Sequence, residues 1–206
     1  MSFAVRQMGA GDLEAAVALQ KLAFPPPFPQ EYHWDASDLA HHIELFPGGQ
    51  FVAIQEGAVI GTCSNTIVPE ERWQARQNWY LTVGGPELGN FDRNGSTLYG
   101  IDITVHPEHR KQGVGRAFYE TRFSLVRSWN LQRYGTGCRM PDYRDFALSH
   151  PGTEIERYAE EVVAGRANDR TLTPLLRYGL RFLCVIHEYM KDLESNNAGA
   201  LLEWTP

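Results

Sequence analysis

One short stretch of the chain combines glycines with basic side chains. Residues 106–116 read His-Pro-Glu-His-Arg-Lys-Gln-Gly-Val-Gly-Arg, and Gly113 and Gly115 lie in the first turn of a predicted helix. The first four N–H groups of a helix lack intrahelical partners, and the positive end of the helix dipole lies beside them. Because glycine carries no side chain, an anion can reach those donors, so the pattern predicts a cradle for a phosphate or pyrophosphate. Positive charge is added by Arg110, Lys111 and Arg116.

Two better-known phosphate-binding motifs do not fit this stretch. The P-loop pattern G-x-x-x-x-G-K-[ST] is absent from the sequence. The dinucleotide fingerprint needs a third glycine where this sequence has Phe118, and a long connection separates Gly113 from the preceding strand. An alternative without a ligand also stays open, in which the glycines only let the helix pack closely.

The spacing R-x-x-G-x-G, after a strand that ends in Val-His-Pro-Glu-His, resembles the GCN5-related N-acetyltransferase (GNAT) superfamily, which uses it to hold the pyrophosphate of coenzyme A. The resemblance implies that acetyl-CoA is the co-substrate. It implies coenzyme contacts from Arg110, Lys111, Gln112, Gly113, Val114, Gly115 and Arg116. In that family the preceding strand aligns the pantetheine arm through its main chain, like an added strand. The corresponding residues here are Ile103, Thr104 and Val105.

A second feature of the superfamily lies further along the chain. The family often carries an asparagine in its last helix, a tyrosine seven positions on, and a Gly-apolar pair that ends the helix. Asn168 and Gly179 stand 11 positions apart, which matches the family spacing, but the tyrosine position holds Leu175. That tyrosine is the family's usual proton donor to the departing CoA thiolate. Tyr178 lies one turn away, at a rotation of about 300°, and could take that role or be a packed aromatic residue at the helix end.

The resemblance is closer to one branch, the acetyltransferase-like domains associated with carbon–nitrogen hydrolases of the nitrilase type. The shared segments are Leu98–Ile103, Arg139–Tyr143, Tyr158–Val162, Asp192–Ser195 and Leu202–Trp204. They imply that a carbon–nitrogen hydrolase is a possible partner. The sequence does not contain the hydrolase itself, so we expect residues 1–206 to form a single N-acetyltransferase-like domain, as the length also predicts.

Asp102 is the candidate catalytic base. In the superfamily an acidic side chain on this strand often takes a proton from the substrate ammonium, directly or through water. The alternative for Asp102 is a solvated or ion-paired carboxylate. The resemblance implies an N-acetyltransferase that moves acetyl from acetyl-CoA to a primary amine of a small-molecule or peptide acceptor by direct attack. The alternative function is a non-catalytic acyl-CoA-binding or sensing module, which Leu175 favours.

The elements around these residues predict an α/β or α+β fold. The clearest strand places Tyr99, Ile101, Ile103 and Val105 on one side and Gly100, Asp102 and Thr104 on the other. Further strands are predicted at 3–6, 51–54, 59–67, 133–138, 182–189 and 200–204. Helices are predicted after Asp12, after Ser37, and at 113–129, 157–163 and 172–178. This order indicates one mixed, mostly antiparallel central sheet flanked by helices, and the resemblance implies central strands splayed at the CoA site.

Residues 68–96 form a long irregular segment, and a connection of this length in a compact domain is usually functional. Its aromatic residues could form a lid over an acceptor or anchor the segment itself. They are Trp73, Trp79, Tyr80 and Phe91. Arg139 and Tyr143 follow a predicted strand, where they could line an acceptor pocket or tie the loop to the body of the protein.

Composition argues against several other classes of function. The chain has 206 residues, of which 43% are hydrophobic and 21% charged, with a formal net charge of -6. So acidic a chain lacks the clustered cations of a broad nucleic-acid-binding surface. Its apolar runs are too short to cross a membrane, and Asp12 and Glu14 interrupt the region that a signal peptide keeps apolar.

Metal binding and disulfides are not expected either. The 3 cysteines are widely spaced and form no zinc or disulfide pattern. His41 and His42 are adjacent, so on a helix they diverge by about 100°. These features predict a reduced, cytoplasmic protein, which could form a homodimer.

Overall fold

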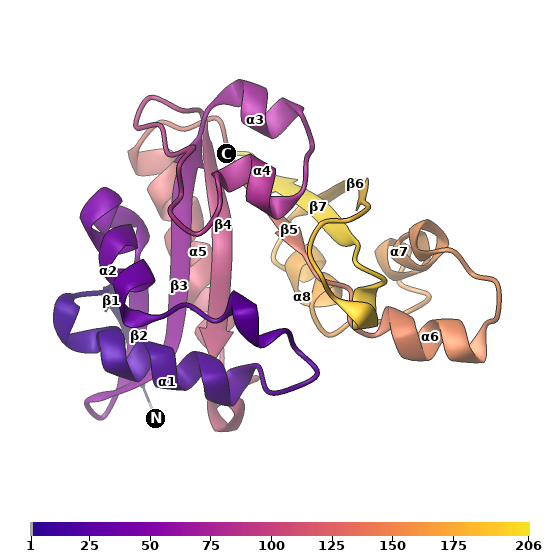
Figure 1. The fold of residues 1–206 in the computed structure, drawn as a ribbon, viewed down its shortest axis with the longest axis horizontal. Helices are drawn as coiled ribbons and strands as arrows, with labels where there is room; N and C mark the ends of the chain where they lie inside the picture. The colour runs from indigo at the N-terminus through magenta and orange to yellow at the C-terminus, as the bar shows by residue number, and fades with distance from the viewer. Residues whose placement is uncertain (1) are drawn as a thin grey trace.

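The computed structural model describes residues 2–206, which contain one seven-stranded sheet in the order β1-β2-β3-β4-β5-β7-β6 (Figure 1). Its strands are β1 (Ala4–Gln7), β2 (Phe51–Gln55), β3 (Ala58–Val68), β4 (Thr97–Val105), β5 (Arg133–Cys138), β6 (Arg181–Ile186) and β7 (Gly199–Trp204). Only the β4–β5 pair is parallel. The prediction of a mixed, mostly antiparallel sheet flanked by helices is therefore confirmed.

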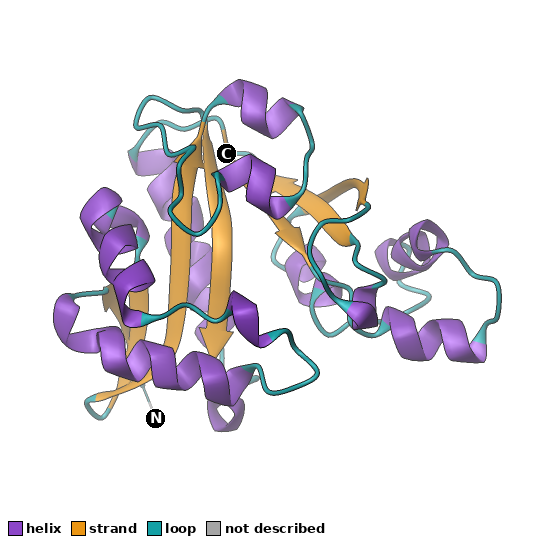
Figure 2. Cartoon of the chain, viewed as in Figure 1, coloured by secondary structure: helices purple, strands orange, loops and turns teal. Residues whose placement is uncertain are grey.

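Helices cover both faces of the sheet (Figures 1 and 2). They are α1 (Leu13–Ala23), α2 (Ala36–Leu45), α3 (Glu70–Gln74), α4 (Trp79–Val83), α5 (Val114–Ser128), α6 (Tyr143–Ser149), α7 (Ile155–Val163) and α8 (Leu172–Arg177). On one face, Ala16 of α1 and Leu39 of α2 belong to the same buried cluster as Val52 of β2. The opposite face packs Val114 and Phe118 of α5 against β2 and β3. No helix within residues 2–206 is long and apolar enough to cross a membrane.

Helix α1 begins directly after Asp12, as predicted, whereas α2 begins at Ala36, before the predicted start after Ser37. Asp12 precedes α1 but does not cap it, because its carboxylate accepts two hydrogen bonds from Arg6, at 2.7 and 2.8 Å. Asp35, and not Ser37, caps α2, since its carboxylate accepts from the N–H groups of Ser37 and Asp38 at 2.7 and 2.9 Å. Helix α2 starts earlier than predicted because several polar residues near a helix start compete for the capping role.

A β-bulge in β4 changes which side chains share a face. Ser64 of β3 pairs with Asp102 while the next residue, Asn65, pairs with Gly100, so Ile101 is the extra residue. The predicted alternation from Tyr99 to Val105 is therefore wrong. Tyr99 and Ile101 pack toward α3 and α4, whereas Ile103 and Val105 pack toward α5. After the bulge, Asp102 stands on the face covered by α1, where its carboxylate contacts Gln20.

The two parallel strands separate halfway along β4, as the sequence analysis expected. Thr97–Gly100 pair with Arg133–Thr136, and there the ladder between β4 and β5 ends. Beyond it β4 stays paired with β3 alone and β5 with β7 alone, so the strands diverge (Figure 1). The splay leaves the main-chain groups on one edge of β4 without a strand partner.

The segment from Val68 to Ser96 is less irregular than predicted, because it contains α3 and α4. The Asn78 side chain caps α4 by accepting from Leu81 N–H at 2.9 Å, and Gly84 ends the helix in a left-handed conformation, with φ 84°. Trp73 is buried against Tyr99, which fits an anchoring role for this aromatic residue. Helix α6 has no counterpart among the predicted helices.

Candidate functional site

The glycine turn before α5 exposes a run of backbone donors. Lys111 and Gly113 have positive φ values of 60° and 91°, which turn the main chain sharply into the helix. Within the described chain, the N–H groups of residues 111–113 donate to no backbone carbonyl. Those of residues 114–116 form the first turn of α5 and have no intrahelical partner. A Cβ on Gly113 would meet no atom within 4 Å, so the space in front of the turn is open.

The side chains predicted to surround the turn make contacts elsewhere in the protein. Arg110 donates to the Ala23 carbonyl at 2.9 Å, so its charge lies at the C-terminal end of α1. Gln112 folds back onto the Glu108 carbonyl at 2.8 Å, and Arg116 forms an exposed ion pair with Glu120 at 3.0 Å. The donors that the turn brings together are main-chain N–H groups.

Tyr178 stands beside this turn, immediately after α8. Its hydroxyl would lie 3.7 Å from a Cβ on Gly115, and its ring is 5.1 Å from that of Tyr119 on α5. Partial burial raises the pKa of the Tyr178 hydroxyl. The structure therefore places the Tyr178 hydroxyl beside Gly115, in the first turn of α5.

Asp102 lies on the opposite face of the sheet, next to the splay. Its Oδ2 accepts from Thr104 Oγ1 at 3.0 Å and from Gln20 Nε2 at 3.3 Å. The same Gln20, on α1, accepts from Trp34 N–H at 2.8 Å, and this bond holds its amide in place. Burial raises the pKa of the Asp102 carboxyl, and the bonds from Thr104 and Gln20 oppose that rise. Asp102 is an oriented carboxylate on the α1 face.

Arg122 of α5 is a buried cation that was not among the predicted site residues. Its Nε donates to Asn65 Oδ1 at 2.7 Å, and its Nη2 donates to the carbonyls of Ser64 and Asp102 at 3.2 and 2.8 Å. These bonds hold the two strands at the bulge. A charged residue four positions after Phe118, on the apolar stripe of an amphipathic helix, was the sequence feature that could have revealed it.

The guanidinium of Arg122 also lies between two aromatic rings of the α5 face. Its carbon is 5.1 Å from the centre of the Tyr119 ring and 5.2 Å from that of Tyr134. The Tyr134 hydroxyl is buried and has no hydrogen-bond partner among the described residues. Leu175, at the position where the superfamily carries tyrosine, is buried in the same apolar cluster.

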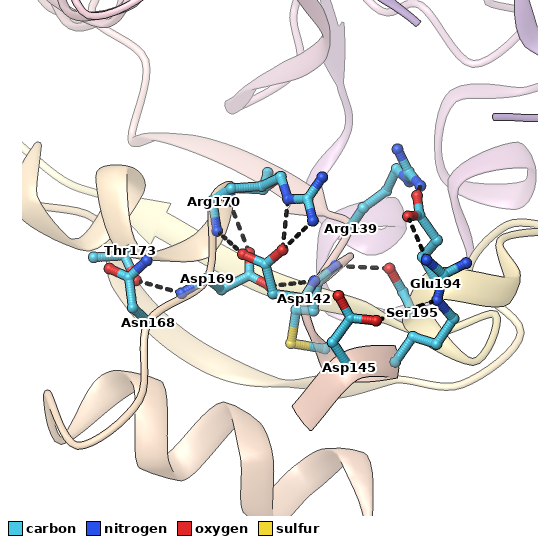
Figure 3. Close-up of polar contacts among 12 residues, drawn as sticks. Arg139, Asp142, Asp145, Asn168, Asp169, Arg170, Thr173, Glu194 and Ser195 are labelled. Carbon is cyan, nitrogen blue, oxygen red and sulfur yellow. Dashed lines mark hydrogen bonds and ion pairs between the residues drawn. The ribbon is translucent and has the colours of Figure 1, made fainter. Parts of the chain in front are cut away.

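Asn168 lies in the connection between α7 and α8, and not in a helix as expected (Figure 3). It borders a hollow of about 480 Å³. Its neighbour Asp169 carries the local hydrogen bonds instead, accepting from Thr171 N–H at 2.8 Å and Leu172 N–H at 2.9 Å. The structure does not bring Asn168 into contact with the glycine turn by any hydrogen bond between described residues.

The loop after β5 is tied to the body of the protein, as one of the two alternatives predicted. Arg139 donates to Asp192 at 2.7 Å and to Glu194 at 2.9 Å, and the Tyr143 hydroxyl donates to the Thr153 carbonyl at 2.9 Å. Ser195 accepts from Met140 N–H in the same network (Figure 3). These contacts fix the end of β5 next to the β6–β7 connection.

A second hollow, of about 190 Å³, opens on the α4 side of the molecule. It is lined by Tyr32, Asn78, Trp79, Tyr80, Glu188, Tyr189, Met190 and Lys191. Trp79 packs against Trp34 with ring centres 5.8 Å apart, and Trp34 is bonded to the glutamine that contacts Asp102. This hollow and Asp102 are therefore connected by one chain of contacts.

His42, one of the histidines considered for metal binding, contacts a backbone carbonyl. His42 Nε2 lies 2.7 Å from the Pro86 carbonyl oxygen, and its burial lowers its pKa. Within residues 2–206, no three His, Cys, Asp or Glu residues converge on a point that could hold a metal ion.

The chain is similar to one protein family and to two proteins of Bacillus subtilis. A model of the Acetyltransferase (GNAT) family matches residues 13–148. The "Uncharacterized N-acetyltransferase YkwB" of Bacillus subtilis (strain 168) is 37% identical over 200 residues, which cover 97% of this chain and 87% of that protein. The "Probable hydrolase YhcX" of the same organism is 31% identical over 201 residues, and this chain spans 38% of its length.

Solved structures share the fold at low sequence identity. The "GphF GNAT-like decarboxylase in complex with isobutyryl-CoA" has a TM-score of 0.80 and 22% identity, with 98% of each chain covered. Its likeness confirms the expected fold. Because the family model matches more than half of the residues and YkwB is similar over nearly the full length, the chain belongs to the Acetyltransferase (GNAT) family.

Proposed function

We propose that the chain is an acetyl-CoA-dependent N-acetyltransferase, which transfers acetyl to a primary amine of a small-molecule or peptide acceptor by direct attack. Acyl transfer follows from membership of an acetyltransferase family, which also makes acetyl-CoA the co-substrate. The observation that supports an amine is the oriented, half-buried carboxylate of Asp102 beside the splay. An amine needs such a base because it is mostly protonated at neutral pH.

The glycine turn fits a pyrophosphate, since its unpaired N–H groups face open space at Gly113. The main chain of Ile103, Thr104 and Val105, on the edge of β4 that β5 leaves, would hold the pantetheine arm. The basic residues and Asn168 remain proposed contacts to the coenzyme. When bound, acetyl-CoA supplies the activated acetyl group.

Asp102 acts on the acceptor in this proposal. Its carboxylate takes a proton from the ammonium, and Thr104 and Gln20 keep the acidic oxygen in a fixed direction. The neutral amine can then attack the acyl carbon. Holding two reactants in a productive geometry contributes several kcal/mol to lowering the barrier, so orientation supplies much of the rate.

The alternative is a non-catalytic acyl-CoA-binding or sensing module. The observation in its favour is Leu175, an apolar buried side chain where the family's usual proton donor stands. A module of this kind needs the glycine turn but not Asp102. The two functions therefore differ in whether the Asp102 carboxylate is required.

Release of CoA from acetyl-CoA, followed with a thiol reagent over a panel of primary amines, separates the two functions. The enzyme releases CoA faster with at least one amine than without, and Asp102→Asn slows that release. If calorimetry shows CoA binding while no amine raises the release rate, the module is correct.

We also propose a carbon–nitrogen hydrolase as a partner, because the relative YhcX is named a probable hydrolase and is much longer than this chain. A single domain over residues 1–206, a homodimer and a cytoplasmic location remain part of the same proposal. Co-purification with a hydrolase tests the proposed partner, and sedimentation of the pure protein tests the homodimer.

A further inference from the structure

We propose that the Tyr134 hydroxyl donates the proton that the leaving thiolate of CoA needs, the role for which Leu175 has no group. The inference rests on the proposed acetyltransferase function. Three observations support it. The buried Tyr134 hydroxyl lies at the splay, it has no hydrogen-bond partner among the described residues, and the Arg122 guanidinium lies beside its ring.

The Tyr134 side chain points along the sheet toward the splay. Tyr134 of β5 pairs with Leu98 of β4, yet its hydroxyl reaches Gly100, two residues further along. A Cβ on Gly100 would overlap that hydroxyl, so only glycine leaves room for it. Because Gly100 is the last residue of β4 that pairs with β5, the hydroxyl lies where the strands begin to diverge.

The hydroxyl is an unsatisfied donor. Tyr134 is 0% exposed, and its oxygen has no hydrogen-bond partner among the described residues. Three other buried tyrosines are satisfied: the Tyr99 and Tyr189 hydroxyls lie 2.8 Å apart, and Tyr158 donates to Asp169 at 3.0 Å. An unpaired buried hydroxyl destabilises the fold, so its retention at the splay indicates a partner that arrives from outside the chain.

The guanidinium of Arg122 places a positive charge beside the Tyr134 ring. The guanidinium lies 5.2 Å from the centre of the Tyr134 ring and is held by Asn65, Ser64 and Asp102, through an amide oxygen and two carbonyls. No carboxylate in the described chain forms a salt bridge with it. Its positive charge is therefore available to stabilise a phenolate formed nearby.

The other tyrosine on this face is less well placed. The Tyr178 hydroxyl lies beside Gly115, at the start of α5, where the main-chain donors of the glycine turn gather. That position suits a contact to the anion in the cradle. Tyr134, in contrast, ends at the splay, near the unpaired edge of β4.

The proton-transfer step balances. The amine nitrogen forms its bond to the acyl carbon, and the carbon–sulfur bond breaks with its electron pair left on sulfur. Asp102 holds the proton that the ammonium gave up before the attack, and the attacking nitrogen loses its second proton to solvent water as the amide forms. Tyr134 gives its hydroxyl proton to the sulfur, and Asp102 then releases its proton to solvent. The Tyr134 phenolate, stabilised by Arg122, regains a proton from solvent before the next turnover.

Tyr134→Phe tests the proposal, with Tyr119→Phe as the control, since Tyr119 is a buried tyrosine beside the same guanidinium. We expect Tyr134→Phe to lower kcat by roughly 10²-fold with little change in KM for acetyl-CoA. We expect Tyr119→Phe to change kcat far less. Removing an unsatisfied hydroxyl leaves the urea midpoint of Tyr134→Phe unchanged or raises it, so lost activity cannot be blamed on unfolding.

A binding measurement gives a readout without turnover. By calorimetry, the wild type should bind CoA more tightly than desulfo-CoA, because the hydroxyl pairs with the sulfur, and Tyr134→Phe should bind the two equally. Equal affinities in the wild type, or full activity of Tyr134→Phe in an active enzyme, overturn the inference and leave the proposed function standing. A wild-type protein that binds neither ligand overturns both.

Discussion

At the scale of single residues, the proposed chemistry depends on a carboxylate whose surroundings are unusual. Asp102 is half-buried, contacts Thr104 and Gln20, and lies on the strand that borders the splay. Burial raises its pKa above the usual value of about 3.9 for aspartate. The carboxylate therefore forms only as the pH rises through that raised pKa. The rate of a reaction that uses this carboxylate as a base should rise over the same pH range.

Asp102→Asn should lower kcat/KM by roughly 10²-fold or more at neutral pH. The wild type should lose activity as the pH falls through the raised pKa of Asp102. The variant should lack this acid limb and recover partly at high pH, where the amine is itself deprotonated. A pH profile of kcat/KM measures both effects, and identical profiles for the two proteins contradict the assignment of Asp102.

Gly113→Gln should weaken CoA binding more than Arg110→Ala does. The glutamine side chain fills the open space before the turn, whereas Arg110 contacts Ala23 and leaves the main-chain donors in place. Gly113 has φ 91°, so any side chain there also costs about 1–2 kcal/mol of backbone strain. Gly113→Ala shares that strain and is the matched control in calorimetry. Unchanged affinity in a folded Gly113→Gln protein would show that the anion binds elsewhere.

The sequence predicts some of these residues and not others, for a physical reason. Gly113 and Gly115 can be found because a helix start is a local feature, readable from neighbouring residues. Tyr134 and Gly100 meet only because β4 and β5 pair in one register. That register depends on contacts between residues far apart in the chain, so no local pattern shows that a hydroxyl lies at the splay.

At the scale of elements, the short helix α3 is joined to β5 by an ion pair. Glu70 accepts from Arg133 at 2.5 Å and also from Gln74 at 2.7 Å. Chiefly because of Arg133, the pKa of Glu70 falls to about 2. The charged form is thus favoured in the folded protein, and the contribution to stability is lost as the pH falls from the unfolded pKa of about 4.3 toward 2.

Glu70→Gln should lower the free energy of unfolding at pH 7 by less than about 1 kcal/mol, because the Glu70 side chain is 40% exposed and solvent screens the pair. The difference between wild type and variant should shrink as the pH approaches 2. Urea unfolding at a series of pH values measures it. A difference that stays constant down to pH 2 would show that the pair does not stabilise α3.

The bulge in β4 shows where pattern reading fails at this scale. An alternating run such as Tyr99 to Val105 predicts a regular strand, and the strand is present. One extra residue, Ile101, reverses the facing of the side chains on either side of it. The polar contacts of Arg122 with the Ser64 and Asp102 carbonyls hold this irregularity, and they come from a helix that no inspection of β4 alone would include.

At the scale of the whole molecule, coenzyme binding should join the two halves of the sheet that diverge at the splay. A ligand that binds only the folded state at 100 times its Kd adds about 2.7 kcal/mol to the free energy of unfolding. We expect CoA to raise the Tm of the wild type and to protect residues 103–105 and 111–117 together in hydrogen exchange. Protection of the glycine turn alone would contradict the proposed path of the pantetheine arm.

The placement of the two halves of the site also bears on the order of events in turnover. The glycine turn opens at the start of α5, on one side of the sheet, and Asp102 stands with α1 on the other. The sheet thus lies between the two groups, and strands β4 and β5 diverge beyond Gly100 (Figure 1). In the proposed reaction, the donor and the acceptor therefore approach from opposite sides of the sheet and do not displace each other. Such an enzyme needs no acetylated side chain as a go-between, and its initial-rate plots should intersect, as for a sequential mechanism, instead of running parallel.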